Sequence, residues 1–407
     1  MAQERNLASN AGEQVSGAKA LRVALLTAGR DRPYALGLGA ALAGQGIALD
    51  YIGSEEVDGP EVRNAAGIRI LHFRDQREDA GIIQKVFRIA RYYARLIRYA
   101  FASKCPIFHV LWNNKFEVLD RTFLMALYRL TGRRVVFTAH NVNAGQRDGT
   151  DSWLNRWSLK CQYRLAHHIF VHTESMKAEL GRQFQIPAAN VTVVPFGINN
   201  TTPVTSLSSS EARKKLGLNA SDKVILFFGN VAPYKGLEYL VEAFAGCVAE
   251  DASLRLVIAG KPKGSEAYWQ EVKARIREAK VDAAVVEKLD YIPDEEVEIY
   301  FKASDVVALP YNHIFQSGVL FLGYGFGLPV IATDVGSLRE EIIEGKTGFI
   351  CRPRDPADLA LAIRKYFGSE LFKELSSRRA EIRAYANARY SWTRVGELTE
   401  AVYERLA

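Results

Sequence analysis

The sequence lacks the features of several large protein classes. None of its apolar runs approaches the ~20 residues that a membrane-spanning helix needs, and residues 1–19 contain no apolar stretch typical of signal peptides. The four cysteines are far apart and show no C-x-x-C spacing, which argues against a disulfide framework or a structural metal. We therefore expect a cytoplasmic globular protein whose residues 1–19 form a flexible tail.

Acidic residues are scarce in the first half of the chain only. The formal net charge is +7, and residues 1–200 carry 26 Lys and Arg against 17 Asp and Glu, whereas the remainder carries 27 against 29. The N-terminal half should therefore meet an anionic partner. Charge alone admits nucleic acid, acidic lipid headgroups or a phosphorylated substrate.

Short apolar strands alternate with helical patterns in two series. Such alternation predicts parallel sheets covered by helices, and so an α/β protein with two doubly wound, Rossmann-like domains. A Thr- and Ser-rich stretch, 199–210, separates the series, so we expect one domain over 20–198 and a second over 199–385. The predicted strands are 21–27, 47–52, 67–72, 107–112, 135–138 and 169–172, then 224–228, 254–259, 285–289, 306–309 and 329–333.

Two turns of the second series carry residues that suit a phosphate group. In the first, a strand ends at Gly229 and Lys235 leads into a helix, so that an ammonium group and free backbone N–H groups meet. A surface lysine beside a turn glycine explains this segment equally well. In the second, the small residues Ser317 and Gly318 precede a helix starting at Val319 and let backbone amides approach a diphosphate. The two turns together favour a nucleoside diphosphate.

Polar residues also follow a strand of the first series. His140 and Asn141 come directly after the strand 135–138 and should face the cleft between the domains. A histidine there could orient a sugar hydroxyl or polarise a leaving group, although a lone loop histidine is more often structural. The pair His167-His168 lacks convincing metal spacing, so no metal is expected.

A basic stripe marks one predicted helix of the N-terminal half. Arg88, Arg91, Arg95 and Arg98 recur at spacings of three and four, beside aromatic and aliphatic residues. This pattern is typical of an amphipathic helix on an anionic membrane, and a solvated basic face is the alternative. A second candidate contact patch consists of Trp153, Leu154, Arg156, Trp157 and Lys160.

Taken together, these segments resemble the retaining glycosyltransferases of family 4, which have the GT-B fold of two Rossmann-like domains. The resemblance covers about residues 20–400 and is strongest from Val191 on. It rests on the order and spacing of Val193–Asn199, Phe228–Gly236, Asp305–Pro310, Gly327–Thr333 and Gly345–Phe349.

The resemblance implies a nucleotide-sugar site in the C-terminal domain. Lys235 would bind the donor diphosphate, Tyr291-Ile292 would flank the base, and His140 would lie beside the transferred sugar. The last helix, about 386–407, would cross back onto the N-terminal domain. No cofactor or metal is implied. The donor-binding residues would be Gly229, Asn230, Lys235, Tyr291, Ile292, Gln316, Ser317, Gly318 and Val319.

Two departures separate the chain from the family pattern. The arginine that precedes the donor lysine in the family is Asn230 here, and the paired glutamates, eight positions apart, fall on Ile314 and Leu322. These changes put recognition of the ribose and the sugar in doubt. A divergent subgroup with a Q-S-G-V segment is our preferred interpretation.

The sequence therefore predicts a retaining hexosyltransferase that uses a nucleoside-diphosphate sugar. The basic N-terminal half suggests a lipid-linked saccharide acceptor, as in polysaccharide or envelope glycan assembly, and a peripheral contact with the inner face of the membrane. A non-catalytic GT-B subunit that binds a partner or lipid is the alternative, and an epimerase of the same fold is weaker. Nucleic acid fits the basic stripe less well than a membrane does. The expected acceptor or membrane residues are Arg88, Arg91, Arg95, Arg98 and Asn141.

Overall fold

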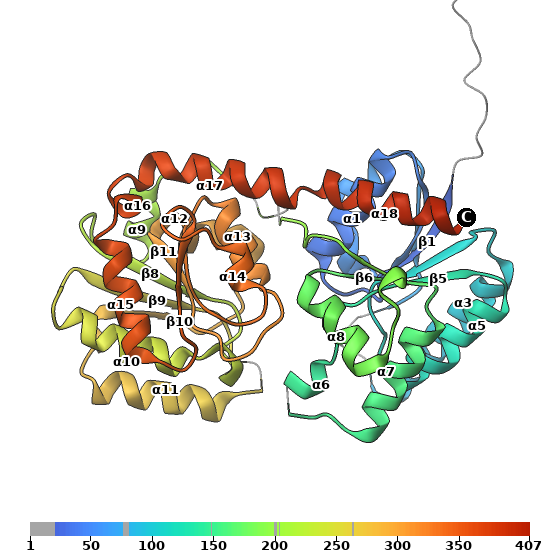
Figure 1. Ribbon diagram of the computed structural model, residues 1–407, viewed down its shortest axis with the longest axis horizontal. Coiled ribbons are helices and arrows are strands. Elements are labelled where there is room, and N and C mark those ends of the chain that lie inside the picture. The colour runs from blue at the N-terminus through green and yellow to red at the C-terminus, as the bar shows by residue number, and fades with distance from the viewer. Residues whose placement is uncertain (1–20, 76–80, 148, 199–201, 203, 263) are drawn as a thin grey trace, which may run out of the picture.

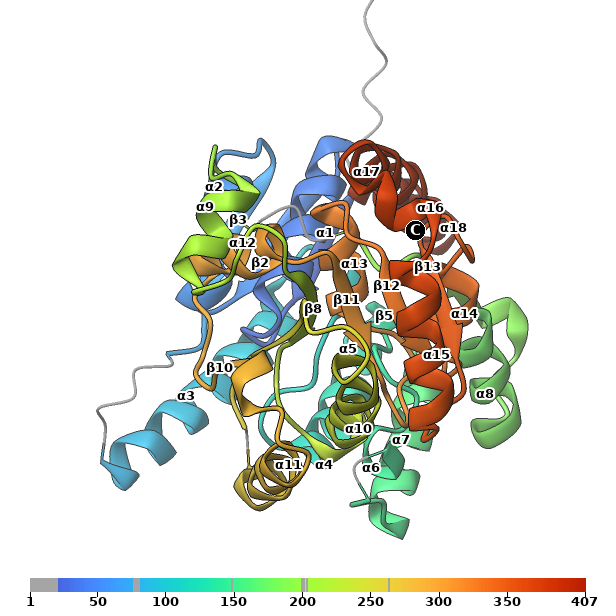
Figure 2. The same cartoon turned by 90° about the vertical axis from the view of Figure 1, so that its left-hand side faces the viewer.

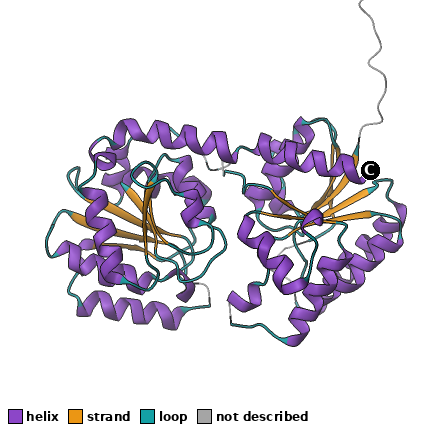
Figure 3. Cartoon of the chain, in the orientation of Figure 1, coloured by secondary structure: helices purple, strands orange, loops and turns teal. Residues whose placement is uncertain are grey.

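The chain forms two lobes that lie side by side, each with a sheet between layers of helices (Figure 1, Figure 3). The structure is a computed structural model and describes residues 21–75, 81–147, 149–198, 202, 204–262 and 264–407. The expected tail, 1–19, and the start of the expected linker, 199–201, lie outside the described residues.

The N-terminal lobe is built on a parallel sheet, which has seven strands within the described residues. Their order is β3-β2-β1-β4-β5-β6-β7, and every pair is parallel. The strands are β1 Arg22–Leu26, β2 Ala48–Gly53, β3 Ile68–His72, β4 Ile107–Val110, β5 Arg134–Thr138, β6 His168–Val171 and β7 Val191–Val193. The helices are α1 Arg32–Gly44, η1 Glu55–Val57, α2 Pro60–Arg63, α3 Ile82–Ala102, α4 Glu117–Leu119, η2 Asp120–Leu124, α5 Met125–Leu130, α6 Ala144–Arg147, α7 Trp153–Leu165, α8 Glu174–Phe184 and η3 Ala188–Asn190.

The C-terminal lobe repeats this plan with a six-stranded parallel sheet over its described residues. Its order is β10-β9-β8-β11-β12-β13. The strands are β8 Lys223–Phe228, β9 Leu254–Ala259, β10 Val285–Lys288, β11 Val306–Leu309, β12 Val330–Thr333 and β13 Gly348–Cys351. The helices are α9 Ser209–Lys215, η4 Pro233–Lys235, α10 Leu237–Val248, α11 Glu266–Glu278, η5 Asp282–Ala284, α12 Asp294–Ala303, α13 Gly318–Gly325, α14 Leu338–Glu341, α15 Pro356–Phe367, α16 Glu370–Lys373, α17 Leu375–Tyr390 and α18 Trp392–Leu406.

Both sheets are buried on both faces, which explains why their strands are continuous apolar runs. Every residue of β4, β6, β11 and β12 is buried, because helices cover the two sides of each parallel sheet. Strand order reverses at β1/β4 and at β8/β11, and ligands of such sheets bind at the carboxyl ends near the reversal.

The last two helices tie the lobes together. α17 runs from the C-terminal lobe towards the N-terminal one, and α18 packs against α1 (Figure 1, Figure 2). The indole of Trp392 fills the space beside Gly37 and Gly197, where an added Cβ would lie 2.0 and 2.4 Å from its ring. Ile198 donates its N–H to the carbonyl of Tyr390 at 2.9 Å. The two places where the chain passes from one lobe to the other, after β7 and after α17, are therefore hydrogen-bonded to each other.

The structure departs from the predicted elements where short or polar segments are stabilised by their neighbours. β7 and β13 were not predicted as strands, because each is short and completes the edge of an existing sheet. The last helix, expected over about 386–407, is α18 Trp392–Leu406, because α17 continues to Tyr390. α9 begins inside the expected linker, because Ser208 and Glu211 form a capping box.

Candidate active site

The carboxyl ends of β8, β9 and β10 form one edge of the C-terminal sheet. Gly229 donates its N–H to the carbonyl of Ala259 at 2.9 Å, and Gly260 donates to the carbonyl of Lys288 at 2.9 Å. Gly260 has a φ of 148°, and a Cβ there would lie 2.0 Å from the carbonyl oxygen of Gly229. Because only glycine allows this approach, the turn after β8 is held firmly at the ligand-binding edge.

Lys235 is a buried cation at this edge. Its side chain is only 6% exposed, and Nζ donates to the carbonyl of Phe228 at 3.2 Å. The same Nζ lies 5.7 and 5.6 Å from the ring centroids of Phe227 and Tyr311. Lys235 forms no ion pair with any described residue, and burial lowers its pKa to about 8. A buried ammonium group without a counter-charge is suited to binding an anion.

The start of α13 adjoins Lys235, so the two turns predicted from the sequence meet. A Cβ added to Gly229 would lie 2.9 Å from Nζ of Lys235 and 3.7 Å from Cγ2 of Val319. The hydroxyls of Tyr311 and Ser317 are 3.3 Å apart. Ser317 occupies the N-cap position but its side chain caps no backbone N–H of α13. The first turn of this helix thus faces the same place as the lysine.

Two amide side chains near this point have unsatisfied hydrogen-bonding atoms. Both Nε2 and Oε1 of Gln316 are buried without a partner in the described part of the chain, and so is Oδ1 of Asn312. Nδ2 of Asn312 donates to the carbonyl of Pro233 at 3.1 Å. Each unsatisfied buried polar atom costs about 1–3 kcal/mol, so a polar ligand would remove a penalty. Asn312 was missed by sequence reasoning, because a single asparagine in a loop carries no pattern.

The remaining predicted donor residues are spread along the same edge. Tyr291 follows β10 and is 70% exposed, whereas Ile292 is buried. Asn230 and Gly318 are exposed. No direct contact joins Tyr291 to Lys235 in the part of the chain that the structure describes, although both follow strands of one sheet edge.

His140 lies in an aromatic cluster at the carboxyl end of β5. Its ring stacks on Trp112 with centroids 4.1 Å apart and an interplanar angle of 4°, and meets the edge of Tyr34 at 4.7 Å. Nδ1 of His140 is 3.0 Å from Nε2 of His172. The neighbouring Asn141 is partly exposed, and its carbonyl accepts from the hydroxyl of Tyr163 at 3.5 Å. These contacts fix the orientation of the imidazole.

Burial keeps the two histidines uncharged. Desolvation and the nearby His172 lower the pKa of His140 far below its usual value, against a small opposite effect of the Leu111 backbone. Burial also lowers the pKa of His172 to about 4. Nε2 of His140 is buried and has no well-aligned hydrogen-bond partner among the described residues. The ring is therefore neutral and supplies no positive charge, and Nε2 would have to be uncovered before it could bond to a ligand hydroxyl.

A third histidine, His109, supports this cluster from behind and was missed by sequence reasoning. Its Nδ1 is 2.5 Å from the hydroxyl of Tyr403 on α18, and its Nε2 is 2.7 Å from the hydroxyl of Thr138 on β5. Burial lowers the pKa of His109 to about 3. The sequence does not indicate this role, because Tyr403 is 294 positions away in the chain and meets His109 only when α18 packs on the N-terminal lobe.

Aromatic rings connect the two sites across the lobes. Phe196 lies 5.1 Å from the ring of His172 and stacks on Phe321 of α13 at 5.8 Å. Phe315, just before α13, packs into the hydrophobic core of the N-terminal lobe. No direct contact joins the described side chains of His140 and Lys235. The link is indirect: Phe196 contacts His172 beside His140, and it also stacks on Phe321 of α13.

The predicted basic stripe on α3 is divided. Arg95 donates to the carbonyls of His72 and Phe73, at 3.5 and 3.0 Å, and Arg88 pairs with Asp75 at 3.2 Å. Arg91 and Arg98 are exposed. The expectation of one continuous stripe thus fails in part, because the loop after β3 offers carbonyl and carboxylate partners. A pocket of about 300 Å³ opens here, lined by Glu56, Arg74, Asp75, Lys85, Arg88, Ile89, Tyr92, Tyr93, Asn114 and Lys115.

The two positions that align with the paired glutamates of the family are packing positions. Leu322 is buried in the C-terminal core, and Ile314 packs against that core. A Cβ at Gly336 would lie 2.0 Å from the carbonyl oxygen of Ile314. Both side chains make apolar contacts at positions where a glutamate would need a positively charged or hydrogen-bonding partner.

Comparisons with known proteins agree with this architecture. A family model described as Glycosyltransferase Family 4 matches residues 33–201, and one described as Glycosyl transferases group 1 matches residues 208–389. Sucrose-phosphate synthase from Thermosynechococcus elongatus superposes with a TM-score of 0.73 at 20% identity, covering 95% of this chain and 99% of that one. HepE of Anabaena, in complex with UDP and glucose, has a TM-score of 0.72 at 17% identity, covering 95% and 100%.

The fold is therefore GT-B, that of a two-domain glycosyltransferase. The two family models match one after the other, so the N-terminal half of the chain is similar to Glycosyltransferase Family 4 and the C-terminal half to Glycosyl transferases group 1.

Curated relatives match only part of the chain. D-inositol 3-phosphate glycosyltransferase of Corynebacterium urealyticum is 29% identical over 242 residues, 58% of this chain and 56% of the relative. The protein of the same name from Corynebacterium diphtheriae is 28% identical over 280 residues, 66% and 64% respectively. The chain thus spans less than two thirds of the length of these relatives. In the described part of the chain, no helix combines the length and apolar character needed to cross a bilayer.

Proposed function

We propose that the protein is a retaining hexosyltransferase that takes its sugar from a nucleoside-diphosphate donor. The single observation that carries this proposal is Lys235, a buried ammonium group with no counter-charge, placed beside Gly229, which also adjoins Val319 in the first turn of α13. A diphosphate would supply that counter-charge. The relatives named glycosyltransferases and the complex of HepE with UDP and glucose support this choice of ligand.

Catalysis would rest on stabilising the leaving diphosphate. As the bond between sugar and diphosphate breaks, negative charge develops on the diphosphate, and Lys235 with the backbone N–H groups of α13 would balance it. The buried amide of Gln316 would add a hydrogen bond. Because Asn230 and the apolar residues Ile314 and Leu322 supply no charge, Lys235 would be the main cation of the donor site.

His140 would serve the transferred sugar as a neutral hydrogen-bonding group. Its Nε2 atom is buried and lacks a well-aligned partner among the described residues, while stacking on Trp112 holds the ring. A ring held in this way would accept from or donate to one sugar hydroxyl once the bound sugar reaches Nε2. This role needs no change of protonation state at physiological pH.

The acceptor would be a lipid-linked saccharide with a phosphate or diphosphate group. The pocket beside α3 lies where β3 and β4 end and is lined by four basic side chains against two acidic ones. Ile83, Val86 and Phe87, on the same helix, are exposed and would enter the headgroup region of the membrane. The exposed Arg91 and Arg98 would contact anionic lipids.

Nucleotide binding tests the proposal. UDP, GDP, ADP and dTDP, each with a matching nucleotide sugar, are added to the purified protein and the melting temperature is measured. One nucleotide should raise it through preferential binding to the folded state, and Lys235→Ala should abolish the shift. Lys214→Ala, at an exposed position of α9, is the matched control. If no nucleotide binds, or if Lys235→Ala binds normally, the donor site is wrong and the non-catalytic GT-B subunit becomes the better description.

A further inference from the structure

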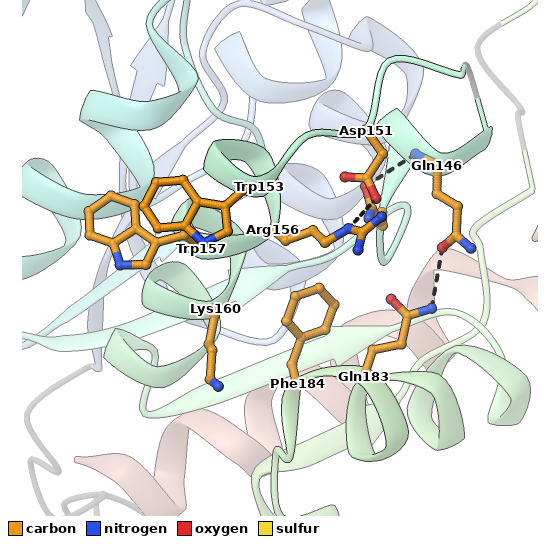
Figure 4. A pocket seen from close by; sticks show the side chains of 9 residues that line it. Gln146, Asp151, Trp153, Arg156, Trp157, Lys160, Gln183 and Phe184 are labelled. Carbon is orange, nitrogen blue, oxygen red and sulfur yellow. Dashed lines mark hydrogen bonds and ion pairs between the residues drawn. The ribbon is translucent and has the colours of Figure 1, made fainter.

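A second pocket of the N-terminal lobe lies apart from the proposed donor site and from the pocket beside α3. It has a volume of about 530 Å³ and is formed by α6, α7 and α8 (Figure 4). Trp153 and Trp157 from α7 form one wall. Apart from Phe184, polar side chains line the rest, among them Gln146, Asp151 and Gln183.

The two tryptophans form an exposed aromatic wall. Their rings are stacked, with centroids 6.4 Å apart and an interplanar angle of 16°, because the residues are four apart on α7. Trp153 is 77% exposed and Trp157 is 44% exposed. Two large apolar faces kept open to water, rather than packed in the core, indicate an interaction site.

The polar wall is ordered by hydrogen bonds within the pocket. Asp151 accepts from Nε of Arg156 at 2.6 Å and from Nδ2 of Asn155 at 2.8 Å. Burial alone would raise the pKa of Asp151, but these hydrogen bonds outweigh it and hold the pKa below its usual value. Nε2 of Gln183 donates to Oε1 of Gln146 at 3.3 Å, joining α8 to α6 (Figure 4). Planar amides, a carboxylate and a guanidinium group are thus held beside the indole rings.

We infer that this pocket binds a saccharide. The C–H faces of a pyranose ring are apolar and pack on indole rings, while its hydroxyls need planar donors and acceptors at the ring's edge, and the pocket supplies both. Lys160 also lines the pocket and forms no ion pair with the described residues. It would contact an anionic substituent, such as the carboxylate of a uronic acid.

A lipid surface fits the pocket less well. Insertion of Trp153 and Trp157 into a membrane would bring Asp151 and the two glutamines towards the hydrocarbon, where unpaired polar groups are costly. The helix α3 also lies on the opposite side of the view from α8, which forms part of this pocket (Figure 2). A saccharide, by contrast, uses the aromatic and polar groups together.

The pocket is connected to the candidate active site by one loop. The chain leaves β5 at Thr138, carries His140, and reaches the pocket at Asn143. Oδ1 of Asn143 accepts from Nδ2 of Asn155 at 2.9 Å and so ties this loop to α7. On the assumption of the proposed function, the bound saccharide is the part of the acceptor remote from the hydroxyl that reacts. The binding itself does not depend on that function.

Direct binding of oligosaccharides tests this inference. The full-length protein, without nucleotide, is applied to an array of neutral and uronate-containing oligosaccharides of two to six sugars, and hits are measured by calorimetry. We expect Kd values in the millimolar range or tighter for at least one glycan. Trp153→Ala and Trp157→Ala should each weaken binding at least tenfold, and Trp157→Phe should restore most of it. Leu154→Ala is the control, because Leu154 is exposed on α7 but does not line the pocket.

The outcomes separate this site from its alternatives. If no oligosaccharide binds, or if both alanine variants bind normally, the inference is wrong. It is also wrong if these variants lose binding only to vesicles of acidic phospholipid, since the tryptophans then contact lipid. The nucleotide-induced shift in melting temperature should be the same in all variants. If the unmodified protein binds a glycan but shows no nucleotide-induced shift, the proposed function is wrong and the saccharide site is still supported.

Discussion

In the C-terminal lobe, the carboxyl edge of the sheet holds a buried lysine without a counter-charge. In the N-terminal lobe, the corresponding edge holds the buried His109 and His172 and the partly buried His140, all uncharged. Burial lowers the pKa of both kinds of group. Lys235 starts from a much higher value, so it stays largely protonated at pH 7, whereas the histidines lose their protons. The same physical effect thus produces a cationic edge in one lobe and a neutral hydrogen-bonding edge in the other.

This contrast matches the chemistry proposed for each side. A diphosphate needs fixed positive charge, and a sugar hydroxyl needs a neutral donor or acceptor. The net basic excess of the N-terminal half lies elsewhere, in part on α3 and around its pocket. The half of the chain with the net positive charge therefore has the uncharged edge, and the other half has the cationic edge.

Removing the charge of Lys235 should have the largest effect. Lys235→Met should weaken nucleotide binding by about 2–5 kcal/mol, the range found when one partner of a buried charge pair is lost. The same change should stabilise the ligand-free protein by about 1–3 kcal/mol, because the unpaired buried ammonium group disappears. Calorimetry and chemical denaturation measure the two. If the ligand-free Lys235→Met protein is less stable than the unmodified protein, Lys235 is not an unpaired buried cation.

The attachment of α18 to the N-terminal lobe should be nearly as sensitive. Gly37→Ala places a Cβ 2.0 Å from the ring of Trp392, and overpacking of this kind costs about 1–3 kcal/mol. Gly44→Ala on the same helix meets nothing within 4 Å and serves as the control. We expect a lower melting temperature for the first variant only. Equal melting temperatures would show that α18 does not pack on α1 as described.

A buried acid near the crossing of the lobes provides a pH test. Burial raises the pKa of Glu341 to about 7, while Arg389 opposes this shift, and the hydroxyl of Tyr390 donates to its carboxylate. Because the folded-state pKa is raised, its contribution to stability is present at low pH and is lost between about pH 4.5 and 7. Glu341→Gln should therefore stabilise the protein at pH 8 by about 1–3 kcal/mol and have little effect at pH 4.5. Urea unfolding at both pH values measures this difference.

Nucleotide affinity should itself depend on pH. Since the pKa of Lys235 is about 8 in the ligand-free protein, the protonated fraction falls about tenfold between pH 7 and 9, and affinity should fall by a similar factor. The folded state binds fewer protons than the unfolded state between about pH 8 and 10.5, so this group makes stability rise over that range. Lys235→Met should bind equally weakly at both pH values. A pH dependence that survives in the variant would require another group.

The smallest expected effect concerns the membrane contact. Arg91→Gln and Arg98→Gln should each weaken binding to acidic vesicles by about 1 kcal/mol, and added salt should weaken it further. Arg95→Gln should matter less for vesicles, because Arg95 donates to backbone carbonyls. Co-sedimentation with vesicles measures all three. If Arg95→Gln loses more affinity for vesicles than Arg91→Gln, the arginines of α3 act as one continuous stripe.

Much of the fold could be predicted from the sequence, because parallel strands buried on both faces are apolar runs. The segments β8, β9 and β11 were predicted within about one residue of their bounds. Short edge strands such as β7 and β13 carry too few residues for a pattern. They form because a neighbouring strand offers unpaired backbone groups.

The candidate site divides in the same way. Gly229, Lys235 and Ser317 were predicted from turn chemistry, since a ligand-binding turn needs small residues and a cation wherever it lies in the chain. Asn312 and His109 could not be predicted, because their importance depends on burial and on partners distant in sequence.

The sequence by itself determined the strand–helix alternation, the separation into two series and the residue types of the two turns that we predict to bind phosphate. These are local properties, recorded in periodicity and in glycine positions. Only the tertiary structure decided that Lys235 is buried without a counter-charge, that Arg88 and Arg95 turn away from the exposed face of α3, and that two tryptophans border a pocket. Each of these depends on which distant groups lie nearby, and burial and pairing are set by packing in three dimensions.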